Sequence, residues 1–183
     1  MRSSLALLTV AGKDRPGIIA TVTQLLFQQG CNLEDVSMTI LEGEFSMMMI
    51  VSLKPNQRNL VQKKLEELQK KSKLTFFWKA LDGKRERGEK HHSGSVSHLI
   101  IAIGRDRTGI VYKISQVLAA FKINITDLNS RILGHGKNAV YAMMLEADIP
   151  KSFSVKRLDL ALRQLQKSLG IEISIKPVER LQF

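Results

Sequence analysis

The sequence predicts an α+β fold in which one βαββαβ module occurs twice in tandem. The first observation is an internal repeat: residues 12–18 reappear as residues 104–110, at an offset of 92 throughout. The second is that apolar residues follow the same succession of strand and helix periodicities in both copies. The third is that the copies differ in length only between periodic segments, where a duplicated fold tolerates insertions. The 183 residues are therefore expected to form two small domains.

The first strand and helix of the module are predicted within residues 5–30. Residues 5–11 form a continuous apolar run, which is typical of a strand buried on both faces. A helix is expected to follow, because Asp14 is a good helix cap, Pro16 suits a first turn and apolar residues then recur at helical spacing. Gly30 is expected to end this helix.

The remaining part of the module is predicted as ββαβ. Residues 32–41 and 45–53 flank a Glu-Gly-Glu turn, and the second segment alternates apolar residues with period two, which indicates a β-hairpin. Residues 59–72 place leucine and valine on one helical face and charged residues on the other. Residues 74–78 alternate as a last strand. The right-handed crossover rule then puts both helices on one face of a four-stranded antiparallel sheet.

The second copy repeats this order from Val96 to about Val178. Beyond Gly43, an offset of 94 matches residues 45–53 with residues 139–147, since the second copy has a longer turn. The last helix matches at an offset of 97. Each change of offset falls in a loop, as expected of a duplicated fold.

The segment between the copies is predicted to be a linker, because it is rich in charged residues and glycine and has no apolar residue from Gly83 until Val96. The predicted organisation is a first domain over residues 1–81, a basic polar linker over residues 82–95 and a second domain over residues 96–183.

Composition places the chain among soluble globular proteins, with 44% hydrophobic and 25% charged residues. Its single cysteine, Cys31, excludes an intrachain disulfide and favours a cytoplasmic location. Residues 5–11 are interpreted as a strand rather than as the core of a signal peptide, since residues 99–103 repeat the pattern internally. No apolar run approaches the roughly 20 residues that span a bilayer, so no membrane partner is predicted.

The net charge of +11 raises the hypothesis of nucleic-acid binding. Divided after His92, the chain has 15 basic and 10 acidic residues in its first part and 13 and 7 in its second, which gives +5 and +6. The excess is spread over both copies, and we find no helix-turn-helix, zinc-finger or aromatic RNA-binding motif. Direct nucleic-acid binding therefore remains the weaker alternative.

The turn after the first strand carries a resemblance to a known family. It reads Asp-Arg-Pro-Gly-Ile at residues 14–18 and Asp-Arg-Thr-Gly-Ile at residues 106–110, and an Asn-x-x-Asp sequence opens the second predicted strand from Asn32 and again from Asn124. With the βαββαβ order, each copy resembles an ACT domain, which implies a ferredoxin-like fold and binding of amino acids. Two such domains in tandem resemble the glycine cleavage system transcriptional repressor family. That resemblance implies action through a DNA-binding protein partner.

A physical reason for ligand binding lies in the glycine turns. Backbone N–H groups at the start of a helix lack acceptors and lie at the positive end of the helix dipole, so they can bind a carboxylate. Gly17 and Gly109 place no side chain in the way. The resemblance implies that such sites form where two domains pair. The candidate ligand-binding residues are Asp14, Arg15, Pro16, Gly17, Ile18, Asn32, Asp35, Asp106, Arg107, Thr108, Gly109, Ile110, Asn124 and Asp127.

Each candidate also has a purely structural interpretation. The aspartates of the turns, Asp14 and Asp106, are good helix caps. The turn glycines are equally explained by close packing, and Asn32 and Asn124 by a turn. The arginines of the turns either pair with an anion or stay solvated. Since Thr108 replaces Pro16, the two copies have diverged at the turn itself.

Other chemistry finds little support in the sequence. The four histidines and one cysteine show no metal-ligand spacing, so neither a metal nor a cofactor is predicted. No nucleophile elbow, phosphate loop or paired acid motif occurs, so the protein is not predicted to be an enzyme. A detached regulatory subunit of an amino acid biosynthetic enzyme remains an alternative to a transcriptional role.

The assembly prediction follows from the edges of the sheets. A four-stranded sheet has two edges whose backbone groups need covering. We therefore expect the two sheets to pair edge to edge into an eight-stranded sheet, with further homodimerisation an open alternative. The predicted partners are a small-molecule ligand such as an amino acid and a regulatory protein such as a transcription factor.

Overall fold

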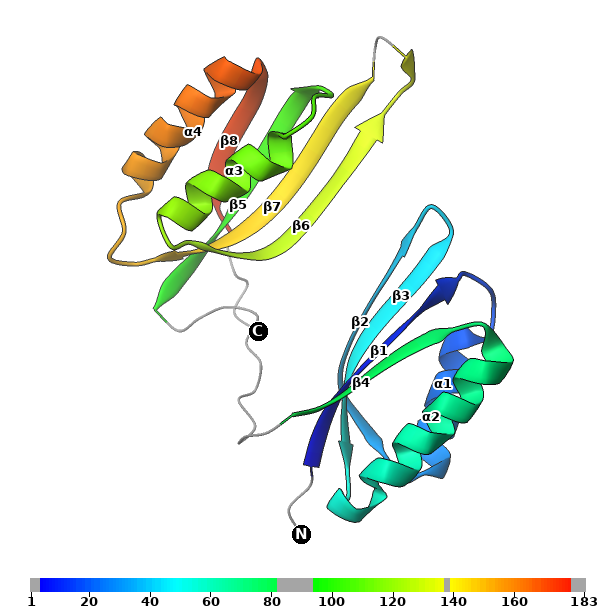
Figure 1. Cartoon of the computed structure of the whole chain (residues 1–183). Coiled ribbons are helices and arrows are strands. Elements are labelled where there is room, and N and C mark those ends of the chain that lie inside the picture. Colours follow the sequence, from blue (N-terminus) through cyan, green and yellow to red (C-terminus); the bar gives the residue numbers. More distant parts are fainter. Residues whose placement is uncertain (1–3, 82–93, 137–138, 179–183) are drawn as a thin grey trace. The chain divides into compact units, whose positions relative to one another are not determined.

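A computed structural model describes residues 4–81, 94–136 and 139–178 (Figure 1). The chain divides into two compact units, Met1–Arg85 and Glu86–Phe183. Each unit contains one βαββαβ module with its own hydrophobic core. Most of the predicted linker, residues 82–93, lies outside the described residues.

The first unit forms a four-stranded antiparallel sheet with strand order β2-β3-β1-β4. Both helices cover the same face of this sheet (Figure 1). A short 3₁₀ turn, Pro55–Gln57, precedes the second helix. The elements are β1 (Ser4–Lys13), α1 (Ile18–Gln28), β2 (Asn32–Leu41), β3 (Glu44–Leu53), α2 (Arg58–Ser72) and β4 (Thr75–Leu81).

The second unit repeats this topology, with strand order β6-β7-β5-β8. Its helices also lie on one face of the sheet (Figure 1). The tandem ferredoxin-like fold is thereby confirmed, whereas the pairing of the two sheets stays a prediction. The elements are β5 (Ser95–Arg105), α3 (Ile110–Ala120), β6 (Asn124–Leu133), β7 (Val140–Pro150), α4 (Val155–Leu169) and β8 (Ile171–Pro177).

The strand register corrects one detail of the repeat. Ile40 pairs with Phe45 in the first unit, and the equivalent Ile132 pairs with Tyr141 in the second. The third strands therefore match at an offset of 96, so that Phe45 corresponds to Tyr141, and the predicted offset of 94 is wrong. A shift of two residues keeps every side chain on its face of the sheet, so alternation alone does not reveal the error.

The first helix begins later than predicted. The residue before helix α1 is Gly17, with φ 92°, and the residue before α3 is Gly109, with φ 95°. No side chain caps either helix by a hydrogen bond. The interpretation of Asp14 and Asp106 as helix caps is therefore wrong, because the left-handed glycine rather than the aspartate turns the chain into the helix.

The core of each unit lies between the sheet and its helices. In β1, Ala6, Leu8 and Val10 are fully buried, but the alternate residues Leu5 and Leu7 are only half-buried. The prediction that this strand is buried on both faces is wrong within the unit, since both helices lie on the same side of the sheet. The opposite face, which we call the open face, carries the alternate residues of each strand.

Candidate functional site

The glycines of each module serve two different purposes. A Cβ atom added to Gly17 or Gly109 would meet nothing within 4 Å, so these residues are not required for close packing. Their positive φ values instead favour glycine, because other L-residues are strained in that conformation. By contrast, a Cβ on Gly104 would lie 2.7 Å from Cγ2 of Ile171. Close packing is therefore the role of Gly104, at the end of β5, and not of the turn glycines.

Backbone N–H groups without an acceptor in their own helix follow each glycine turn. The first bond inside helix α1 runs from the Thr21 N–H to the Gly17 carbonyl at 2.9 Å, and in α3 from the Lys113 N–H to the Gly109 carbonyl at 3.0 Å. The N–H groups of residues 18–20 and 110–112 precede these bonds and have no acceptor within the helix. Since the positive end of the dipole lies at the same place, the turns favour an anionic group.

In the first unit, a cavity of about 540 Å³ lies beside the glycine turn. It brings together the five predicted residues of the turn with apolar residues of the neighbouring strands. Sequence reasoning missed the strand residues, although their period-two alternation places them on the helix face of the sheet. The lining residues are Asp14, Arg15, Pro16, Gly17, Ile18, Ile19, Ala20, Met38, Ile40 and Phe45.

In the second unit, the matching cavity is smaller, about 300 Å³. It includes the first three residues of α3, and Tyr141 of β7 lies at the position of Phe45. The Tyr141 hydroxyl is buried and has no hydrogen-bond partner among the described residues. The lining residues are Arg107, Gly109, Ile110, Val111, Tyr112 and Tyr141.

The arginines of the turns contact the ends of neighbouring helices. Nη2 of Arg15 donates a hydrogen bond to the carbonyl of Ser72, the last residue of α2, at 3.0 Å. The Arg107 guanidinium lies beside Gly170, which follows α4: a Cβ added there would be 3.8 Å from both Nη atoms. A cation at a helix C-terminus is stabilised by the dipole and by free carbonyl groups. Arg15 is therefore a helix-capping residue, a role that sequence reasoning did not predict.

The predicted aspartates of β2 and β6 lie away from the glycine turns. Asp35 pairs with Ile50, whose side chain is on the open face of the sheet. Asp127 pairs with Glu146 in the same way, and its carboxylate accepts a hydrogen bond from the Leu128 N–H at 3.0 Å. Because the helices and glycine turns lie on the other face, neither aspartate joins the turn of its own unit.

Asn32 lies at the opposite end of α1 from the glycine turn. The helix has 11 residues, which span about 16 Å at about 1.5 Å per residue. The Asn32 side chain donates a 3.4 Å hydrogen bond to Oε1 of Glu34. Asn124 occupies the equivalent place at the start of β6. One small ligand therefore cannot contact the turn and the asparagine of the same unit.

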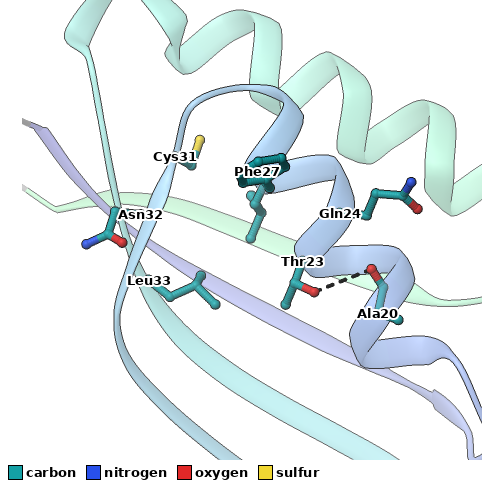
Figure 2. A pocket seen from close by; sticks show the side chains of 8 residues that line it. Ala20, Thr23, Gln24, Phe27, Cys31, Asn32 and Leu33 are labelled. Carbon is teal, nitrogen blue, oxygen red and sulfur yellow. Dashed lines mark hydrogen bonds between the residues drawn. The ribbon is translucent and has the colours of Figure 1, made fainter.

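A further cavity, of about 660 Å³, surrounds this end of α1 (Figure 2). Phe27 projects at its rim and is 80% exposed. Cys31 is half-buried, and burial raises the pKa of its thiol, which keeps the thiol protonated at neutral pH. Sequence reasoning did not predict this cavity. Its lining residues are Ala20, Thr23, Gln24, Leu26, Phe27, Cys31, Asn32 and Leu33.

Two other kinds of site receive no support from the described residues. Among them, no group of three or more histidine, cysteine, aspartate or glutamate side chains is placed to hold a metal ion. Within the same residues, no helix is long and apolar enough to cross a membrane. Of the four histidines, His91 and His92 lie outside the part of the chain that the structure describes.

Comparison with known families identifies the modules. The model of the ACT domain family matches residues 4–79 and again residues 97–176. The chain belongs to the ACT domain family. Both glycine turns, their helices and the cavities beside them lie within the matched residues, and each of the two units is one ACT domain.

Relatives in sequence match a part of this chain that is about as long as one ACT domain or shorter. A UPF0237 protein of Methanosarcina mazei is 31% identical over 86 residues, which are 46% of this chain and 89% of that protein. A UPF0237 protein of Methanopyrus kandleri is 45% identical over 65 residues, which are 36% of this chain and 71% of that protein. Most of each relative therefore aligns with less than half of this chain.

Solved structures match the tandem arrangement. A protein of unknown function from Galdieria sulphuraria has a TM-score of 0.81 at 23% identity, covering 97% of this chain and all of that one. A protein assigned as a glycine cleavage system transcriptional repressor has a TM-score of 0.71 at 20% identity, covering 98% of this chain and all of that one. At such identities the similarity shows a shared fold.

Proposed function

We propose that this chain is a regulatory protein that binds a small amino acid at a glycine turn and transmits the occupancy of that site to a partner protein. ACT domains are regulatory domains that sense small molecules such as amino acids. The observation that carries the proposal is the combination of unpaired helix N–H groups with an open cavity beside them in each ACT domain.

The separation of Asn32 from the turn of its own unit bears on how a complete site is built. We propose that a second ACT domain supplies the other wall. If two edge strands equivalent to β2 pair antiparallel, the start of one strand lies beside the end of the other. An asparagine at the start of one strand then approaches the glycine turn of the other domain, and both contact one ligand.

We further propose that the partner protein that responds to ligand binding is one that controls transcription of genes for amino acid metabolism. The solved repressor has the same two-domain architecture over nearly the whole chain, which supports this hypothesis over a role in catalysis. A regulatory subunit of a biosynthetic enzyme is the second candidate, since ACT domains regulate enzymes by the same physical principle. Direct nucleic-acid binding is the third and rests on net charge alone.

Thermal unfolding tests ligand binding directly. We expect one or more of the twenty amino acids, with glycine and serine tried first, to raise the melting temperature. A ligand at 100 times its Kd stabilises the folded state by about 2.7 kcal/mol. Replacing Gly17 or Gly109 by alanine should reduce the rise, because alanine is strained at φ values of 92° and 95° and the turn that presents the free N–H groups would have to change. A screen without any rise contradicts the proposal.

Affinity capture from the native host separates the candidate partners. We expect the captured protein to be a DNA-binding regulator, and its recovery to change when the stabilising amino acid is added. Capture of a biosynthetic enzyme instead would favour the second candidate. Strong DNA binding by the isolated chain that weakens steeply with salt would favour the third.

A further inference from the structure

The hydroxyl group of Tyr141 is an unexplained polar group in the second ACT domain. Tyr141 is 9% exposed, and its hydroxyl has no hydrogen-bond partner among the described residues. Buried polar groups are almost always hydrogen-bonded in folded proteins, because leaving them unpaired destabilises the fold. The side chain lines the cavity beside the Gly109 turn.

The first ACT domain has no such group at the equivalent place. The strand pairing makes Phe45 the counterpart of Tyr141, and Phe45 is a fully hydrocarbon side chain in the cavity of the first domain. The two cavities therefore differ at one position by a single oxygen atom. The fold does not require that oxygen, since the first domain is built without it.

The other polar groups of the second cavity lie close to the same place. Ile110, Val111 and Tyr112 line it, and these are the three residues whose N–H groups have no acceptor within α3. The side chains of Ile110 and Val111 are apolar. A cavity of about 300 Å³ with a few polar donors and apolar walls suits a small carboxylate-bearing ligand.

We propose that Tyr141 is the specificity-determining residue of the second ACT domain. Its hydroxyl hydrogen-bonds a small α-amino acid whose carboxylate lies on the N–H groups of α3, so that the second domain binds this ligand more tightly than the first. The inference rests on the proposed function, since it concerns the same kind of site. It adds which of the two domains binds the amino acid more tightly and which side chain selects that ligand.

The test compares Tyr141→Phe with the wild-type chain by titration calorimetry and thermal unfolding, with glycine and serine as probes. We expect the affinity for the better probe to fall about tenfold, the effect of one lost hydrogen bond. The melting temperature without ligand should stay the same or rise, because the variant removes an unpaired buried hydroxyl. Phe45→Tyr is the matched control and should leave the affinity of the second site unchanged.

The outcomes separate this inference from the proposed function. Wild-type affinity in Tyr141→Phe overturns the role of the hydroxyl and leaves amino acid sensing intact. A lower melting temperature of ligand-free Tyr141→Phe also overturns it, since the hydroxyl would then have a structural partner. If neither probe nor any other amino acid stabilises the wild-type chain, the inference and the proposed function both fail.

A second, independent observation is the apolar open face of the first ACT domain. Three rows of paired residues cross the sheet, and each contains apolar side chains. Met48 and Phe77 are 51% and 55% exposed, and the others are half-buried on the face opposite the two helices. Exposed apolar patches of this size mark interaction surfaces. The apolar residues are Leu5, Leu7, Met48, Ile50, Phe77 and Leu81.

The second ACT domain shows that the fold does not require this apolar face. Leu7 pairs with Ile50, whereas its counterpart Leu99 pairs with Glu146. Phe77 likewise has Ser174 as its counterpart, since Thr9 pairs with Phe77 and Ile101 with Ser174. The open face of the second domain keeps the apolar residues Leu99, Ile101, Ile103 and Met144 but has Glu146 and Ser174 in place of Ile50 and Phe77, so it is the less apolar of the two.

The dimensions and charges of this face fit a second copy of the chain. Three strands of about 33 Å and one of about 23 Å, at a spacing of about 4.8 Å, present about 600 Å², or about 1,200 Å² for two copies, the lower limit for a stable interface. Asp35 and Lys79 lie at opposite edges of one row, with Ile50 and Leu7 between them. A two-fold axis parallel to the strands places Asp35 of each copy over Lys79 of the other.

We propose that two copies of the chain dimerise through this face, sheet against sheet. Sedimentation equilibrium should give the mass of a dimer for the wild-type chain and of a monomer for Ile50→Glu. Glutamate already occupies the equivalent position 146 in the second domain, so the variant should keep its fold by circular dichroism. Met144→Glu, on the open face of the second domain, is the matched control and should remain dimeric.

Exchanging the charges tests the orientation of the two copies. Asp35→Lys and Lys79→Asp should each raise the dimer dissociation constant, and the double variant should restore it. A monomeric wild-type chain, or an Ile50→Glu variant that stays dimeric, overturns the proposal. If both single variants and the double variant have the dimer dissociation constant of the wild-type chain, the two-fold arrangement is overturned.

Discussion

Single glycines illustrate how two residues of one type carry different physical requirements. A Cβ on Gly104 would lie 2.7 to 2.9 Å from three atoms of Ile171, one of them its backbone Cα. On Gly12, the equivalent Cβ would lie 2.8 Å from Cδ2 of Leu74, the movable end of a side chain. Backbone cannot yield as a side chain does, so the two positions differ in their tolerance of alanine.

We therefore predict that Gly104→Ala destabilises the second domain by about 1 to 3 kcal/mol, the usual effect of overpacking. Gly12→Ala should destabilise the first domain by less, since its nearest backbone contact would be the Lys73 carbonyl oxygen at 3.3 Å rather than a Cα atom at 2.9 Å. Denaturant unfolding of both variants measures the difference. If the two variants lose the same free energy of unfolding, the contact of the new Cβ with Ile171 Cα is relieved by movement of β8.

Cys31 provides a prediction on pH at the same scale. Burial raises the pKa of its thiol, so the folded chain holds this proton more tightly than the unfolded chain does. Its contribution to stability is fully present below the unfolded pKa and is lost as the pH rises through the raised folded pKa. Reaction with a thiol reagent between pH 7 and about 9 should be slower in the folded chain than in urea. Equal rates would contradict the burial of the thiol.

At the scale of elements, the ends of the second helices differ between the two domains. Helix α4 is followed by Gly170 with φ 62°, and α2 by Lys73 with φ 56°. Both residues are left-handed, which glycine adopts readily and lysine at a cost of about 1 kcal/mol or more. Helix α2 therefore ends in a strained residue, Lys73. The same helix end is also capped by Arg15 through its hydrogen bond to the Ser72 carbonyl.

Lys73→Gly is predicted to stabilise the first domain by about 1 kcal/mol, which raises its melting temperature by about 4 to 8 °C. Gly170→Lys is the reciprocal change and should destabilise the second domain by a similar amount. Thermal unfolding of the two variants measures both effects. A lower melting temperature for Lys73→Gly would show that the lysine side chain stabilises the helix end in another way.

At the scale of the whole molecule, the outer strands β2 and β6 are the edges through which we expect ACT domains to pair. Each has a free edge in its own sheet. Free edges either pair or are protected, because unpaired backbone groups favour association. The predicted eight-stranded sheet pairs such edges, and this pairing is distinct from the face-to-face dimer proposed above.

Hydrogen exchange measures this pairing. In β2 and β6, about half of the N–H groups point away from β3 and β7. If the edges pair, these groups should exchange as slowly as those of the central strands, in peptides that cover residues 32–41 and 124–133. Exchange at the rate of exposed strands, under conditions where the chain is fully assembled, would contradict the eight-stranded sheet.

The sequence by itself determined the duplication and the order of elements, because periodicity and turn residues are local properties that do not depend on distant contacts. Only the tertiary structure decided the match of Phe45 with Tyr141, the contact of Arg15 with Ser72 and the position of Asp35 on the open face. These depend on strand register and on contacts between residues far apart in the chain. A period-two pattern is unchanged by a shift of two residues, so register lies beyond what alternation can specify.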